Sequence, residues 1–389
     1  EGEGEGEGEG EGEGEGEGEG EGEGEGEGEG EGEGAGPTYS LVLMHTNDQH
    51  AHFVPYGLES DYTTDLDDDR TVGGIARLAT LVDAQRAAVP EEAAFLLVDA
   101  GDYSMGSLLS FIGPTQGAEL QLLQLLGYDA LTLGNHEFDY FPAALAASIV
   151  AAQEAGFDVP ILQANLGFSA ASPRDDSLQA LVDDGTITPS LIKEYPSGLR
   201  VGLFGLLGTG AAALAPNATP LTFEDEKVAA QRQVDLLRAA GVDVVVALSH
   251  TGTDDAGVGP DRQLARTVAG IDILVSGHSH AVLDEPIVID GPAGGKTLIL
   301  NTGAYCRRVG KLVATVQRGR PVQVEEYALL PVDDSLAAHG EVQAAFKEKS
   351  DPSLMMMVPI FILTLAILLL GIFPGYMIET FTKLANSLL

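Results

Sequence analysis

The chain has 389 residues, of which 20 are basic and 60 acidic, giving a formal net charge of −40. This balance argues against a nucleic-acid-binding protein, because phosphate backbones need clustered lysine and arginine. The single cysteine, Cys306, excludes an intrachain disulfide and leaves the cellular compartment open.

The first 34 residues are a regular Glu-Gly repeat. Such a repeat has no apolar surface to bury, so we expect residues 1–34 to be a disordered, self-repelling tail. Its regularity is typical of an artefact that stands where a targeting segment would lie. The interpretation of the fold therefore begins at residue 35.

Helical and strand patterns alternate over residues 35–331, which predicts one α/β domain. Four amphipathic stretches each end at a glycine that a strand follows. These glycines are Gly127, Gly156, Gly241 and Gly270. Glycine is typical just past the last helical turn, because it adopts a left-handed backbone at little cost. Stretches rich in β-branched residues, such as Val242–Val246, favour strands that are buried on both faces.

Polar side chains follow five of the expected strands. In chain order the expected strands are 40–44, 95–98, 130–133, 157–162, 201–206, 244–248, 273–275, 298–300 and 312–316. The polar residues just after five of them are Asp48, His50, Asp102, Asn135, His136, His250, His278 and His280. Open α/β folds bind ligands at the carboxyl ends of their strands. If these ends align along one rim of a sheet, the polar side chains meet there.

Imidazole nitrogens and carboxylate oxygens without a thiol suit divalent ions such as Mn, Fe, Zn, Co or Ni. The set is too large for one ion that also holds water, and it fits two ions that share a carboxylate. Paired ions about 3.5–4 Å apart acidify a bridging water and bind the oxygens of an in-line displacement at phosphorus. Each residue alone could equally be a helix cap, a turn residue or a hydrogen-bonded bystander. Their recurrence at consecutive strand ends favours the metal site.

The ordered motifs resemble those of the calcineurin-like metallophosphoesterases. They are D-x-H at Asp48, G-D at Gly101, G-N-H-E at Gly134, a lone histidine at His250 and G-H-x-H at Gly277. More narrowly, TNDQHAHF, GNHEFD and PILQAN resemble the catalytic domain of bacterial 5′-nucleotidases and bifunctional cyclic phosphodiesterases. The resemblance implies a four-layer αββα sandwich in which two mixed sheets lie between helical layers.

The resemblance also implies a role for each residue of the set. Asp48, His50 and His280 would bind one divalent ion, Asn135, His250 and His278 the other, and Asp102 would bridge them. His136 would contact the phosphate and protonate the leaving alkoxide, and Asp139 would orient it. Asn135 and His136 would also bind substrate. The implied reaction is phosphomonoester hydrolysis through a metal-bridging hydroxide, with two ions of Mn, Zn, Fe or Co and a nucleotide as substrate.

Other polar residues near the motifs have structural interpretations. We expect His45 to be packed and His52 to lie outside the metal pattern. Glu137 has no evident role as a ligand, and Tyr305 is expected in a turn beneath the site. Arg307 and the arginine after it could neutralise substrate charge, but they are interpreted as surface residues.

The pattern departs from the resembled family after residue 331. Residues 332–353 are expected to be a linker, and the nucleobase-binding domain of that family is missing from the pattern. Residues 354–376 carry no charge and are long enough to span a hydrocarbon core of about 30 Å. The segment 354–389 is therefore predicted to be a transmembrane helix with a short tail, with a buried core helix as the alternative. It would anchor the protein at the cell surface or the periplasmic face.

Two other functions stay open. The same scaffold could hydrolyse a 2′,3′-cyclic phosphodiester or a sulfur ester, because the metal ligands do not identify the leaving group. The chain could also be a membrane-tethered, non-catalytic component with a vestigial metal site, although a complete ligand set argues against this. The expected partners are a phosphorylated small molecule and, through residues 354–376, a membrane, but no nucleic-acid polymer.

Overall fold

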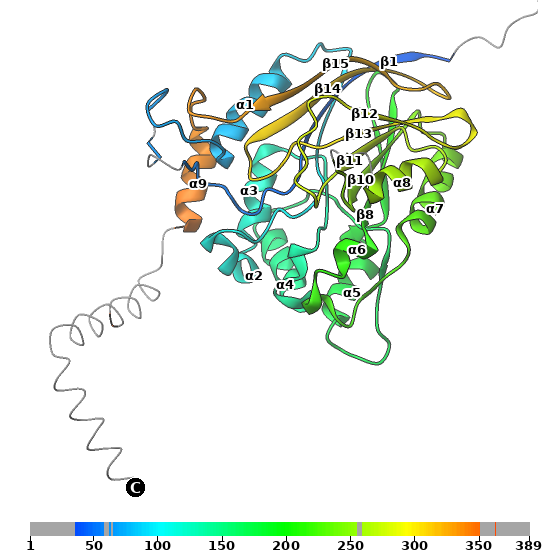
Figure 1. Cartoon of the computed structure of the whole chain (residues 1–389). Coiled ribbons are helices and arrows are strands. Elements are labelled where there is room, and N and C mark those ends of the chain that lie inside the picture. Colours follow the sequence, from blue (N-terminus) through cyan, green and yellow to red (C-terminus); the bar gives the residue numbers. More distant parts are fainter. Residues whose placement is uncertain (1–35, 58–61, 64, 255–258, 351–361, 363–389) are drawn as a thin grey trace, which may run out of the picture. The chain divides into compact units, whose positions relative to one another are not determined.

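Two mixed β-sheets form the centre of the computed structural model, which describes residues 36–57, 62–63, 65–254, 259–350 and 362 (Figure 1). In spatial order, the seven-stranded sheet contains β15 (Gln323–Pro331), β14 (Arg308–Gln317), β1 (Thr38–Thr46), β2 (Ala94–Asp99), β3 (Ala130–Thr132), β4 (Ile161–Leu162) and β6 (Ile187–Thr188). The six-stranded sheet contains β12 (Ile287–Asp290), β13 (Lys296–Leu300), β11 (Ile273–Ser276), β10 (Val244–His250), β8 (Arg200–Leu207) and β7 (Ser190–Glu194). A small third sheet pairs β5 (Leu166–Gly167) with β9 (Thr222–Phe223).

The helices lie between these strands in the chain. They are α1 (Ile75–Ala87), α2 (Gly113–Gln116), α3 (Ala118–Leu126), α4 (Phe141–Glu154), α5 (Asp176–Asp183), α6 (Thr209–Ala212), α7 (Glu226–Ala239), α8 (Pro260–Thr267) and α9 (Gly340–Ser350). Short 3-10 turns cover Leu108–Phe111, His136–Phe138, Pro216–Ala218 and Pro292–Gly294. The four glycines predicted to follow helices all have positive φ, and Gly127 directly caps α3.

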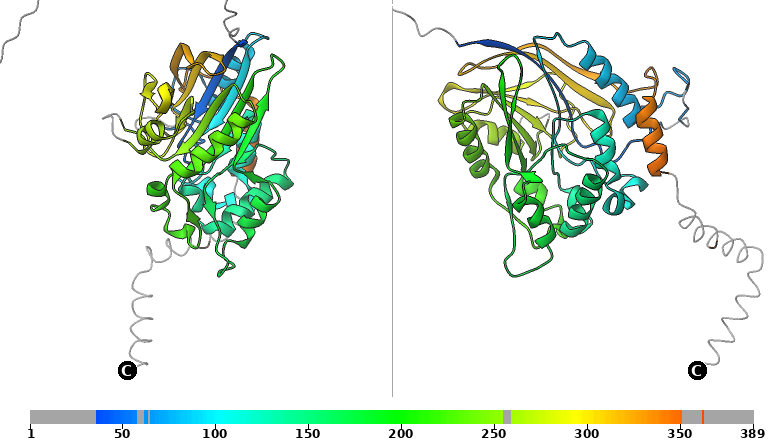
Figure 2. Two further views of the ribbon diagram at one scale, coloured as in Figure 1. Left: turned by 90° about the vertical axis from the view of Figure 1, so that its right-hand side faces the viewer. Right: turned by 180° about the vertical axis from the view of Figure 1, so that it is seen from behind.

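Each large sheet has one face against the other sheet and one face against helices (Figure 2). Leu43 and Leu96 of the seven-stranded sheet share one apolar core with Val246 and Val275 of the six-stranded sheet. The opposite face of the seven-stranded sheet packs against α1, α3 and α4. The opposite face of the six-stranded sheet packs against α7 and α8. The predicted α/β class is therefore confirmed as a mixed α/β fold with several sheets.

The strands that carry the motifs are parallel within each sheet. β1, β2, β3 and β4 run parallel in the first, and β8, β10, β11 and β13 run parallel in the second. Parallel pairing brings the carboxyl ends of neighbouring strands to one edge, so the loops after β1, β2 and β3 meet. Antiparallel strands complete the edges: β14 and β15 in the first sheet, β7 and β12 in the second.

The segment that follows β15 packs onto the same unit. Val332 and Val342 are buried in the core that α1 and α3 share, and the His339 N–H donates to the Ala76 carbonyl. The described part of the predicted linker, residues 332–350, thus contacts the α/β unit directly. None of the helices in the described ranges is both long and apolar enough to cross a membrane. The segment predicted to span one, 354–376, lies outside the described residues except for Ile362, and so does the 1–34 repeat.

Candidate metal centre

The predicted metal ligands lie at the carboxyl ends of strands from both sheets. Asp48 and His50 follow β1, Asp102 follows β2, Asn135 follows β3, His250 ends β10, and His278 and His280 follow β11. The residue pattern alone predicts one rim of one sheet, and this is wrong. The site lies where the ends of two facing sheets meet, because the shared apolar core holds the sheets together beneath it.

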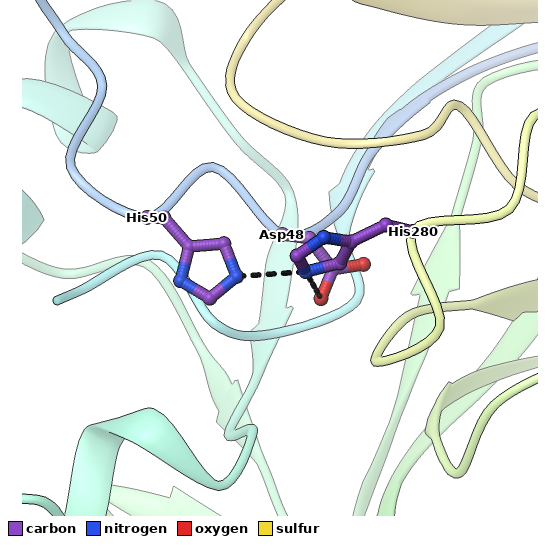
Figure 3. Close-up of side chains that lie close together, drawn as sticks. All are labelled: Asp48, His50 and His280. Carbon is purple, nitrogen blue, oxygen red and sulfur yellow. Dashed lines mark hydrogen bonds and ion pairs between the residues drawn. The ribbon is translucent and has the colours of Figure 1, made fainter. Parts of the chain in front are cut away.

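Asp48, His50 and His280 form the first cluster (Figure 3). The Nε2 atoms of His50 and His280 lie 2.9 Å apart, and His280 Nε2 lies 3.6 Å from Asp48 Oδ1. Behind them, Nδ1 of His50 faces the Met105 carbonyl at 3.0 Å, which fixes the ring. Two imidazole nitrogens and a carboxylate oxygen thus converge on one point.

Asp102, His250 and His278 form the second cluster. His250 Nε2 lies 3.0 Å from Asp102 Oδ2, while its Nδ1 faces the Ala100 carbonyl at 2.8 Å. His278 Nδ1 lies 2.9 Å from the amide oxygen of Asn135, so this amide lies against the second cluster.

Asp102 faces both clusters. Its Oδ2 atom lies 3.9 Å from His50 Nε2 in the first and 3.0 Å from His250 Nε2 in the second. Its Oδ1 atom accepts a hydrogen bond of 2.8 Å from the His136 backbone N–H. This placement fits the bridging role that the family resemblance implies for Asp102.

Burial and mutual charge perturb the titration of the cluster. Burial raises the pKa of Asp48, against the opposing effect of His250. Burial also disfavours charge on Asp102, but the His250 imidazole outweighs it and holds the pKa of Asp102 below its usual range. For His250, burial is outweighed by the Asp102 and Asp48 carboxylates, which raise the pKa to about 10. Without bound cations, therefore, protons balance the buried carboxylates.

The residues fit a pair of divalent cations. His250 Nε2 is completely buried and has no aligned hydrogen-bond partner among the described residues, which is costly unless a cation binds it. Burial lowers the pKa of both His50 and His278 to about 4, so both imidazoles are neutral at pH 7, as metal ligands must be. The described part of the site offers nitrogen and oxygen donors without a thiol, a set suited to Mn, Fe, Zn or Co.

His136 forms a third candidate group with His50 and Asp102, and it lies outside the predicted ligand set. Its ring is 5.1 Å from that of His50, and its Nδ1 lies 2.6 Å from Asp139 Oδ2. The hydrogen bond to Asp139 is the main cause that raises the pKa of His136 to about 9, against the opposing effect of burial. A half-exposed imidazole that stays protonated at pH 7 is suited to donate a proton.

A family model of the calcineurin-like phosphoesterases matches residues 41–282. The chain belongs to this family. It is 31% identical to a Bos taurus 5′-nucleotidase over 288 residues, which cover 70% of this chain and 46% of that protein. The solved structure of a Thermus thermophilus 5′-nucleotidase precursor matches with 28% identity and a TM-score of 0.66, covering 82% of this chain and 60% of that one. A Haemophilus influenzae NAD nucleotidase shares the fold at 21% identity and a TM-score of 0.62, covering 76% and 51%. The chain spans about half the length of the curated relatives it matches.

Two residues of this phosphoesterase that the sequence left without a role position the ligands. The Glu137 carboxylate accepts backbone hydrogen bonds from Asp102 at 3.0 Å and from Gly134 at 2.6 Å, so it ties the loop after β2 to the loop after β3. The Asn47 amide donates to Asp48 Oδ2 at 2.7 Å and to the Gly303 carbonyl at 2.7 Å. Glu137 stands within the GNHE motif together with Gly134, but its other partner, Asp102, is distant in sequence, so spacing gave no signal that it ties the two loops.

The remaining polar neighbours occupy distinct positions around the phosphoesterase site. His45 is fully buried, and burial lowers its pKa to about 3, in agreement with its predicted packing role. His52 lies outside both clusters, with its ring 4.4 Å from that of Tyr305. Tyr305 was expected beneath the site, but its ring lies beside the first cluster, 5.3 Å from His280.

Proposed function

We propose that the protein is a metal-dependent phosphomonoesterase of the 5′-nucleotidase type that uses two divalent ions. The observation that carries this proposal is the pair of ligand clusters that share Asp102, with protonated His136 beside them. By this proposal Asp48, His50 and His280 hold one ion, and Asn135, His250 and His278 hold the other. The site contains no serine or cysteine that the sequence or the geometry singles out as a nucleophile.

The ions, when bound, would acidify a water for attack on phosphorus and neutralise charge on the phosphoryl oxygens. The residues of the chain supply the rest of the chemistry. His136 donates its proton to the leaving oxygen, because its raised pKa keeps it charged at neutral pH. Asp139 holds the ring by its Nδ1 and leaves Nε2 to face the substrate. Asn135 would contribute both to the second ion and to the substrate phosphate.

Nucleotides are the proposed substrates. The similarity to proteins named 5′-nucleotidase supports this class, and the phosphoesterase family match over residues 41–282 includes every predicted metal ligand. The four-layer αββα arrangement is likewise inferred, and the three apolar cores between the sheets and helices support it.

We also propose that residues 354–376 anchor the protein in a membrane, with the site at the cell surface or the periplasmic face. The support is the length and hydropathy of this uncharged segment. Membrane fractionation followed by alkaline carbonate extraction tests the proposal. An anchored protein stays in the pellet, and deletion of residues 354–389 should release it. Recovery of the full chain in the carbonate supernatant would refute the anchor.

Metal analysis and one phosphatase assay test the proposed reaction. The protein should hold two divalent ions per chain and hydrolyse adenosine 5′-monophosphate, with the rate lost in chelator and restored by manganese. Asp48→Asn and His250→Ala should remove at least about 99% of the activity, since each removes a ligand from a different ion.

His339→Ala provides the matched control. His339 lies against Asp83, outside both clusters, so this variant should keep its metal and its rate. A wild-type protein that binds two ions but hydrolyses no phosphate ester would favour the non-catalytic alternative. Unchanged turnover in Asp48→Asn with metal supplied would contradict the site assignment.

A further inference from the structure

The Tyr305 ring extends the candidate site on the side of the first cluster. Its centroid lies 5.5 Å from that of His50 and 5.3 Å from that of His280. Tyr305 and Cys306 both have positive φ, 66° and 56°, in a region that non-glycine residues rarely adopt. The Tyr305 N–H donates to the Asp48 carbonyl at 2.8 Å, so this strained turn is fastened to a predicted metal ligand. Strain of this kind is commonly retained where it serves function.

Arg307 continues the same surface away from the metal cluster. Its guanidinium carbon lies 5.2 Å from the centroid of the Tyr56 ring and 5.8 Å from that of Tyr305. Its Nε donates to the Tyr56 hydroxyl at 2.5 Å. Contacts of this type over aromatic rings stabilise a guanidinium and restrict its orientation.

Tyr56 is itself held in place. Its backbone exchanges two hydrogen bonds with Val72, at 3.0 and 2.9 Å. Next to Val72, Gly73 has a φ of 78°, and a Cβ there would lie 3.0 Å from the Tyr305 carbonyl oxygen and 3.4 Å from the Tyr56 ring. The glycine therefore permits the close approach that brings the two tyrosines to Arg307.

No carboxylate in the described ranges forms an ion pair with Arg307. Six other arginines form ion pairs with aspartate or glutamate: Arg77, Arg86, Arg200, Arg232, Arg238 and Arg318. Arg307 is exposed and forms no ion pair with any described carboxylate, in a chain with 60 acidic residues. Of the guanidinium donors, only Nε is bonded to a described protein acceptor, so its terminal N–H groups have no described protein partner.

We propose that Arg307, held by Tyr56 and Tyr305, binds a second anionic group of the substrate, a phosphate or carboxylate carried by the leaving group. The inference rests on the proposed phosphomonoesterase function. The His50 ring neighbours both the Tyr305 ring, at 5.5 Å between centroids, and the His136 ring, at 5.1 Å. A leaving group protonated by His136 is therefore within reach of the surface that carries Arg307. Two terminal N–H groups of a guanidinium match two oxygens of a phosphate or carboxylate.

The test compares adenosine 5′-monophosphate, whose leaving group is uncharged, with adenosine 3′,5′-bisphosphate, whose leaving group carries a second phosphate. Arg307→Ala should raise KM for the bisphosphate about tenfold, the effect of about 1.4 kcal/mol of lost binding. Its kcat on both substrates, and its KM for the monophosphate, should stay within about twofold of wild type. Arg307→Lys should recover only part of the loss, because an ammonium cannot bind in a bidentate manner.

Arg320→Ala is the charge-matched control. Arg320 is exposed in the turn after β14, at the opposite end of a ten-residue strand and so about 30 Å from Arg307. It should leave the KM of both substrates unchanged. If it raises KM as Arg307→Ala does, the effect reflects net charge and the subsite is refuted. If Arg307→Ala raises KM equally for the two substrates, Arg307 acts only by supporting Tyr305. This result would also refute the subsite.

A binding measurement tests this inference independently of the proposed reaction. In equilibrium dialysis with manganese-loaded protein, Arg307→Ala should weaken adenosine 3′,5′-bisphosphate about tenfold and adenosine 5′-monophosphate by less than twofold. This result would support the subsite even if the wild-type protein hydrolysed neither compound, an outcome that overturns only the proposed reaction. Equal binding of both nucleotides by wild type and variant would overturn the subsite while leaving the phosphatase proposal intact.

Discussion

Backbone strain is concentrated at the residues that form the candidate metal centre. Five of the seven predicted ligands have a positive φ: Asp48 at 51°, His50 at 50°, Asp102 at 55°, His278 at 74° and His280 at 54°. Each such conformation costs on the order of 1 kcal/mol for a non-glycine residue. It persists because each loop is fastened elsewhere, as where the Asp48 N–H donates to the Gly101 carbonyl. The strain turns the side chains of one strand end towards those of the facing sheet.

At the same scale, His136→Ala should separate proton donation from metal binding. The variant should retain its ions, because His136 lies outside the predicted ligand set. Its kcat should fall about 100-fold or more for phenyl phosphate, which has a poor leaving group, and much less for nitrophenyl phosphate. Steady-state kinetics on the two esters, with metal analysis of the same samples, make the comparison. Equal losses on both esters would exclude His136 as the acid.

The pH dependence of kcat provides a second measurement on this residue. Because the Asp139 hydrogen bond raises the pKa of His136 to about 9, the charged acid is present below that pH and is lost above it. We expect kcat for phenyl phosphate to fall as pH rises through about 9. Asp139→Asn removes the negative charge and should move this fall to lower pH. An unchanged profile in Asp139→Asn would contradict the electrostatic role of Asp139.

At the scale of elements, the pairing of β1 with β14 depends on a small residue opposite His45. His45 pairs with Gly310 in this antiparallel ladder, and a Cβ at Gly310 would lie 2.0 Å from His45 Nε2. Tyr327 of β15 stacks on the same imidazole, with ring centroids 6.2 Å apart. The buried imidazole therefore fills the space that the missing side chain leaves. The end of β1 leads directly into the loop of Asp48 and His50, so this packing supports the first cluster.

Gly310→Ala should accordingly destabilise the fold. The added methyl group displaces a buried ring that has no room to move, and overpacking of this kind costs about 1–3 kcal/mol. Denaturant unfolding of the metal-free protein measures the change. Gly340→Ala is the matched control, since a Cβ at Gly340 meets nothing within 4 Å at the start of α9. A Gly310→Ala protein as stable as the control would disprove the packing argument.

At the scale of the whole molecule, the candidate metal centre links two sheets that also share an apolar core. Its ligands come from loops of both sheets, so bound cations would crosslink the halves of the fold. The protein is also strongly acidic, and bound cations offset part of its negative self-repulsion. Metal binding should therefore stabilise the native state as a whole rather than one loop.

Removal of metal should lower the midpoint of thermal unfolding. An ion present at 100 times its dissociation constant contributes about 2.7 kcal/mol, which corresponds to a shift of roughly 5 °C or more for a chain of this size. Differential scanning calorimetry with manganese and with chelator measures the shift. His250→Ala should show a much smaller response than wild type. Equal responses in the two proteins would place the stabilising ion elsewhere.

Much of the site was predictable because its signals are local. An apolar run followed at once by Asp48, Asp102, Asn135 or His250 marks a buried strand and its carboxyl end without any knowledge of partners. The glycines that end helices are an equally local signal. A glycine such as Gly127 is favoured there by its own left-handed backbone conformation, which does not depend on distant residues. These signals predicted the α/β class and the set of residues that the structure brings together.

Tertiary structure decided the features that depend on partners far apart in the chain. The sequence did not predict β7, β12 or β15, because these edge strands are only partly buried. The residue pattern could not predict that the ligands come from two sheets. Apolar periodicity indicates that a strand is buried, but it does not indicate which sheet the strand belongs to or which surface covers it. Glu137 gained its positioning role, and Arg307 its contact with Tyr56, only through folding. The sequence thus determined which side chains stand at strand ends, whereas the packing of the two sheets decided which of them meet.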